Sequence, residues 1–200
     1  MSRLTKFAVL MAALVSAIAL QDALTQGFTG HASALSDEPG QTVPWLANLG
    51  SAVHILAYVA FIAVMLRFGT VIDAGRRVRT ALRWPLIVAY GVIAVVLTAM
   101  EVTNTVGGPL GMVANVVFLV MLLGPPALGV TMLLQGERTP SAYLMTASVP
   151  ALGLTIVLGL VAPDWAHPAY METVVNFGLA LLGVGVTTTA PVRQQAAAPV

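Results

Sequence analysis

Six stretches of the chain are long and apolar enough to cross a membrane as helices. The apolar core of a bilayer, about 30 Å thick, needs roughly 20 predominantly apolar residues in a helix. Together these stretches take up most of the 200 residues and leave no room for a soluble domain. The sequence therefore predicts an all-α, polytopic membrane bundle that forms one domain over residues 1–200. The predicted helices cover residues 4–24, 45–66, 84–100, 109–134, 142–163 and 171–189.

The composition excludes several other classes of protein. Hydrophobic residues make up 58% of the chain and charged residues only 8%, whereas about 25% of the residues in a soluble domain are charged. Disorder requires the opposite balance, low hydrophobicity with high charge. A net charge of +1 without a basic stripe also argues against a nucleic-acid partner.

Two residue types are almost missing, and their scarcity limits the chemistry. The chain has no cysteine, which excludes disulfides and thiolate metal sites. Its one lysine, Lys6, lies near the N-terminus, so a P-loop and a mid-membrane Schiff base are excluded as well. The three histidines lack metal-binding spacing, and we expect neither a metal nor a cofactor.

The basic residues predict the orientation of the bundle. With the N-terminus inside, all nine Lys and Arg residues fall in cytoplasmic segments, and the outer loops contain none. Lys and Arg are enriched in the cytoplasmic loops of membrane proteins. The prediction is six transmembrane helices in the cell membrane, with both termini in the cytoplasm.

The start of the chain has a second interpretation. Arg3 and Lys6, the apolar run 7–20 and the small residues Ala17 and Ala19 also resemble a secretory signal peptide. Cleavage after residue 19 would leave five helices in the same orientation. Retention is favoured, because the apolar character continues through Leu24.

Polar residues inside the predicted spans are the candidates for function, because hydrocarbon is a costly environment for them. They concentrate in the outer third of the bundle, while its inner half contains almost no ionisable group. Each alone can be explained as a contact between helices or a solvated helix end; together they predict a shared polar pocket near the outer leaflet. The candidate ligand-binding residues are His54, Asn115, Asn176, Asp22 and His167, and the candidate acids are Glu101, Glu172 and Asp164.

Three functions fit this inventory. The first is binding or movement of a small amphipathic or lipidic ligand within the bilayer. The second is a membrane-embedded enzyme that uses a carboxyl group as a general acid on an isoprenoid-like substrate, as a terpene cyclase does. The aromatic residues expected to line part of its cavity are Trp45, Tyr58, Trp84 and Tyr90, although Trp84 lies at the inner end. The third is an accessory subunit of a larger membrane complex, with Gly178, Gly183 and Gly185 at the interface between proteins.

Overall fold

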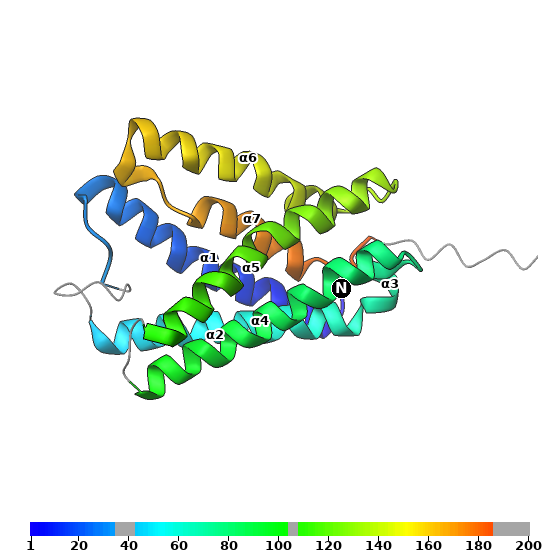
Figure 1. Cartoon of the computed structure of the whole chain (residues 1–200), viewed down its shortest axis with the longest axis horizontal. Coiled ribbons are helices and arrows are strands. Elements are labelled where there is room, and N and C mark those ends of the chain that lie inside the picture. The colour runs from blue at the N-terminus through cyan, green and yellow to red at the C-terminus, as the bar shows by residue number, and fades with distance from the viewer. Residues whose placement is uncertain (35–42, 104–107, 186–200) are drawn as a thin grey trace, which may run out of the picture.

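The computed structural model describes residues 1–34, 43–103 and 108–185, and the ordered elements within these ranges are helices. Figure 1 shows long helices running side by side, with the short helix α7 among them. Five helices are long and apolar enough to cross a membrane, which supports a multi-pass membrane protein. They are α1 (Arg3–Thr29), α2 (Pro44–Arg67), α4 (Arg77–Thr103), α5 (Gly108–Leu134) and α6 (Pro140–Val161).

The remaining elements are short. They are α3 (Gly69–Asp73), the 3-10 turn η1 (Pro163–Trp165) and α7 (Ala169–Ala180). The helix predicted over 171–189 ends at Ala180 in the structure, and residues 186–189 lie outside the described residues. Gly183 and Gly185 have positive φ angles of 84° and 78°, a conformation that does not continue a right-handed helix.

The core is made where α7 packs between α1 and α6 and where α2, α4 and α5 close the other side. Small residues allow the close approaches. A Cβ added at Gly129 would lie 2.9 Å from the backbone nitrogen of Thr146, and one at Gly178 would lie 3.1 Å from the backbone nitrogen of Met145. Small residues at helix crossings are typical of membrane bundles.

The segment between α6 and α7, residues 162–168, packs against the other helices. After α6, residues 162–168 run back along the bundle as a turn and extended segment, and Figure 1 shows α7 starting part-way along its neighbours. The Trp165 ring lies against Gly27 near the end of α1. Irregular backbone that is shielded from water needs internal hydrogen-bond partners. Several backbone groups here find them: Trp165 N–H donates to the carbonyl of Ala162, and the Thr155 hydroxyl donates to that of His167.

One end of the bundle is held by two buried ion pairs. Arg83 donates through Nε and Nη2 to both carboxylate oxygens of Asp73, each at 2.8 Å. Arg79 pairs with Glu137 and donates to Gln135 at 2.6 Å. These contacts fasten α3 and the α5–α6 turn to the first turns of α4.

Candidate functional site

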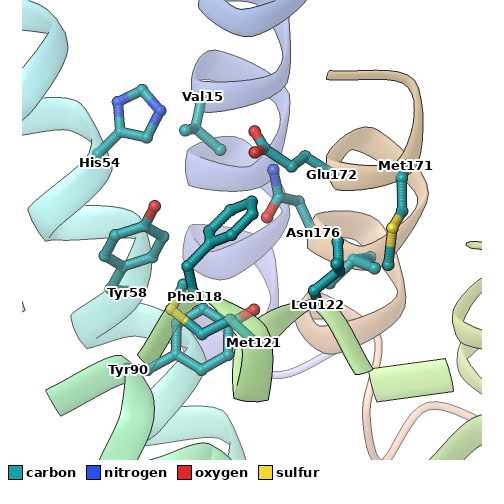
Figure 2. A pocket seen from close by; sticks show the side chains of 11 residues that line it. Val15, His54, Tyr58, Tyr90, Phe118, Met121, Leu122, Met171, Glu172 and Asn176 are labelled. Carbon is teal, nitrogen blue, oxygen red and sulfur yellow. The ribbon is translucent and has the colours of Figure 1, made fainter. Parts of the chain in front are cut away.

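A small cavity lies inside the bundle between five helices, and we call it the chamber (Figure 2). Its volume is about 30 Å³, room for about two water-sized groups. The lining residues lie close to the middle of α1, α2, α4 and α5. They are Val15, His54, Tyr58, Tyr90, Phe118, Met121, Leu122, Met171, Glu172, Val175 and Asn176.

Helical spacing brings the polar lining residues to the same face of their helices. His54 and Tyr58 are four residues apart on α2, and Glu172 and Asn176 are four apart on α7. Residues at this spacing lie one above the other on a helix. In Figure 2 the Glu172 carboxyl and the Asn176 amide point from α7 toward α1 and α2. The chamber is therefore polar on the α2 and α7 sides.

The His54 ring is oriented by its own helix. Its Nδ1 lies 2.8 Å from the Gly50 carbonyl. A carbonyl only accepts, so Nδ1 carries the hydrogen and, in the neutral ring, Nε2 is an acceptor. The ring also contacts Tyr58 edge-on at a centroid distance of 6.1 Å.

Two tyrosines form an aromatic side of the chamber. Tyr58 and Tyr90 meet edge-to-face at a centroid distance of 5.3 Å, and Tyr90 contacts Phe61 in the same way at 6.0 Å. Tyr90 is only 2% exposed. Tyr58, Tyr90 and Glu172 all line the chamber, so side chains of α2, α4 and α7 border the same small volume.

The Glu172 carboxyl has no hydrogen-bond donor among the residues that the structure describes. Neither tyrosine hydroxyl has a hydrogen-bond partner there either. Asn176, which is 5% exposed, donates from Nδ2 to the Ser16 hydroxyl of α1 at 3.4 Å. Its side-chain carbonyl oxygen can accept a further hydrogen bond. Buried polar groups are normally paired. Unpaired ones around a cavity indicate a place for water or for a ligand.

A second cavity adjoins the chamber, and we call it the vestibule. Its volume is about 270 Å³, and it shares His54, Tyr58, Phe118 and Met121 with the chamber. It continues toward the first turns of α2 and the last third of α4. Its other lining residues are Ile18, Ala47, Gly50, Ser51, Ile93 and Leu97.

The structure brings three of the eight predicted site residues to the chamber, namely His54, Glu172 and Asn176. Asn115 is exposed on the outside of α5, and Asp164 is exposed at η1. Glu101 lies in the last turn of α4, outside the chamber lining. The loop residues 35–42, which include Asp37 and Glu38, lie outside the described residues.

Asp22 and His167 form a separate contact nearer the end of α1. Asp22 Oδ2 lies 3.3 Å from His167 Nε2, and Asp22 Oδ1 accepts the Ser33 N–H at 2.7 Å. His167 Nδ1 accepts the Ala169 N–H at 3.1 Å. This pair ties α1 to the segment before α7 and satisfies one of the free N–H groups at the start of that helix. Asp22 and His167 therefore hold the start of α7 in place against α1.

Sequence reasoning had no signal for the apolar half of the chamber. This half consists of residues that are common in any apolar helix, and only the packing of α5 and α7 places them at the chamber. They are Phe118, Met121, Leu122 and Met171. Within the described ranges, no three His, Cys, Asp or Glu side chains lie close enough to hold a metal ion. A comparison of the chain with protein-family models, curated proteins and solved structures found no match in any of the three.

Proposed function

We propose that this protein binds or moves a small amphipathic ligand whose polar head occupies the chamber. The observation that carries the proposal is that the Glu172 carboxyl and the Tyr58 and Tyr90 hydroxyls all line the chamber, and none of them has a hydrogen-bond partner among the described residues. The ligand would satisfy these atoms, as ligands in apolar pockets do with a few oriented polar groups.

The vestibule supports a ligand with an apolar part. The chamber is too small for more than a head group, whereas the adjoining cavity of about 270 Å³ has the aliphatic side chains of Ile18, Ile93 and Leu97 in its lining. A ligand spanning both would leave its apolar portion beside Ile18, Ile93 and Leu97. The lipid bilayer itself is the natural source of such a molecule.

Organic extracts of the purified protein test this function. We expect mass spectrometry to find a small amphipathic molecule in the wild type and roughly tenfold less of it in Glu172→Gln, because a charged hydrogen-bond acceptor is lost. Asn176→Ala should lower the amount as well. Asn115→Ala is the matched control, since this asparagine is exposed outside the chamber. Identical extracts from all four proteins would contradict the proposal.

Catalysis is a second candidate, favoured by one observation. The unpaired Glu172 carboxyl faces a cavity with the aromatic side chains of Tyr58, Tyr90 and Phe118, an arrangement suited to protonating an alkene and stabilising the resulting carbocation. Under this alternative, Glu172→Gln abolishes turnover of an isoprenoid-like substrate while binding survives. The other two predicted acids, Glu101 and Asp164, lie outside the chamber.

The accessory-subunit hypothesis has less support from the packing. Cβ atoms added at Gly178 and Gly183 would touch Met145 and Phe68 of the same chain, so these positions are occupied internally.

We also propose that the protein lies in the cell membrane, crosses it six times and has both termini in the cytoplasm. The path of the last segment supports the sixth crossing. Trp165 contacts Gly27 at one end of the bundle, while Gly183 contacts Phe68 at the other. The twelve residues of α7 span about 18 Å at 1.5 Å per residue, so residues 162–168 would cover the outer part of that crossing.

A further inference from the structure

We infer that the head group which the chamber takes is a primary ammonium, so that the ligand is an amphipathic amine. This inference rests on the proposed binding function and narrows it to one chemical class. Its first basis is the balance of donors and acceptors around the chamber. Glu172 offers two carboxylate oxygens, Asn176 offers its carbonyl oxygen and the neutral His54 offers Nε2. The Tyr58 and Tyr90 hydroxyls can each accept a hydrogen bond as well as donate one, so acceptors outnumber donors. An ammonium is the complementary group, because it has three N–H donors and no acceptor.

The charges of the lining residues also favour an amine. Glu172 is an acid, and no Lys or Arg is among the lining residues. The basic side chains that are buried in the described part of the chain, Arg79 and Arg83, are paired with Glu137 and Asp73 at one end of the bundle. Glu172 is partly buried, and a carboxylate withdrawn from water without a counter-ion is costly. A cationic ligand would supply the counter-ion that the protein does not.

The aromatic side chains favour a cation as well. Tyr58, Tyr90 and Phe118 all border the chamber, and the edge-to-face packing of the two tyrosines keeps their rings at fixed angles. Aromatic faces attract ammonium groups through the ring quadrupole. A carboxylate or phosphate head would instead be repelled by Glu172 and by these electron-rich faces.

The volume selects among amines. A chamber of about 30 Å³ accommodates a group the size of one or two waters. A primary ammonium has this size, whereas a trimethylammonium is larger and has no N–H to donate. The structure therefore predicts a preference for primary over quaternary amines.

Calorimetric titration of the full chain in detergent micelles tests the inference with four probes that share an eight-carbon tail. The probes are octylamine, octanol, octanoate and octyltrimethylammonium, each corrected with protein-free micelles. We expect octylamine to bind the wild type at least tenfold more tightly than octanol, the gain typical of a charged hydrogen bond. The other two probes should bind more weakly than octylamine. In Glu172→Gln the preference for octylamine over octanol should disappear, and in Asp164→Asn, an exposed acid outside the chamber, it should persist.

The possible outcomes distinguish a failure of the amine inference from a failure of the proposed ligand-binding function. Equal binding of octylamine and octanol to the wild type, each weakened by Asn176→Ala, would overturn the amine inference and leave ligand binding intact. Octyltrimethylammonium binding as tightly as octylamine would also overturn it, and this comparison needs no variant. Binding of all probes that is unaffected by both Glu172→Gln and Asn176→Ala would overturn the inference together with the proposed function.

Discussion

Asn176 shows what can and cannot be predicted about a single residue in this chain. An amide in an apolar helix is conspicuous in the sequence, and the same is true of His54 and Glu172. These three residues meet at the chamber. Asn115 is equally conspicuous, yet it is exposed. The sequence contains no signal for the difference, because it depends on how each helix is rotated about its axis, and the low amphipathicity of these helices does not fix that rotation.

Asp73 gives a prediction at the scale of one residue. Its hydrogen bonds with the Arg83 guanidinium lower the pKa of its carboxyl below the ordinary 3.8. A lowered folded-state pKa adds stability that is fully present above the unfolded pKa and is lost as the pH falls through the folded one. We therefore expect Asp73→Asn to reduce the free energy of unfolding by about 1–3 kcal/mol at neutral pH.

The difference between wild type and Asp73→Asn should shrink as the pH falls below 3.8. Thermal unfolding of both proteins in detergent at neutral and acidic pH measures this. A difference that stays constant through the acid range would show that the contact stabilises the protein through packing alone.

At the scale of elements, composition defined the long helices well and the last helix poorly. Length and apolarity are enough to find a 20-residue span, and α2, α5 and α6 begin and end within about two residues of their predicted limits. The limits of the other two were wrong: α1 continues to Thr29 rather than ending at residue 24, and α4 begins at Arg77 rather than at residue 84, because both helices extend into polar sequence. The segment 171–189 is also mostly apolar, although it contains Glu172 and Asn176. Its helix starts slightly earlier, at Ala169, and ends at Ala180, because Gly183 and Gly185 just beyond it have positive φ angles and Gly183 packs against Phe68.

The crossing of α5 and α6 provides a test at this scale. A Cβ at Gly129 would lie 2.9 Å from the Thr146 nitrogen and 3.0 Å from the Ala142 carbonyl oxygen, both backbone atoms that cannot rotate away. Gly129→Ala should therefore destabilise the protein by about 1–3 kcal/mol through overpacking. Gly153→Ala, where the Cβ would meet open space, should be neutral or stabilising by up to about 1 kcal/mol. Comparable unfolding temperatures for the two variants would rule out a close helix crossing.

For the whole molecule, the distribution of charge is the most informative property. The basic residues that are exposed in the structure gather at the end of the bundle where α4 begins, and the two acids among them are paired with Arg79 and Arg83. The exposed ones are Arg3, Lys6, Arg67, Arg76, Arg77 and Arg138. Sequence alone predicted this separation, because it depends only on which loop each residue occupies.

The absence of cysteine makes the orientation directly measurable. Thr70→Cys would place a thiol at the basic end, and His31→Cys would place one beyond α1 at the other end; both positions are exposed. We expect a membrane-impermeant maleimide to label His31→Cys in intact cells and Thr70→Cys only after lysis. The reverse pattern would invert the proposed orientation, and equal labelling would argue against a spanning bundle.

The position of α7 has a consequence for how this protein is made. Glu172 and Asn176 belong to the last described helix, and their neighbours Val15 and Ser16 belong to the first. During translation α1 is therefore synthesised first, and α7 is the last of the described helices to be synthesised. The chamber is therefore incomplete on every nascent chain until α7 has left the ribosome and packed against α1, so an unfinished chain in the membrane would lack the binding site that the finished one is proposed to have.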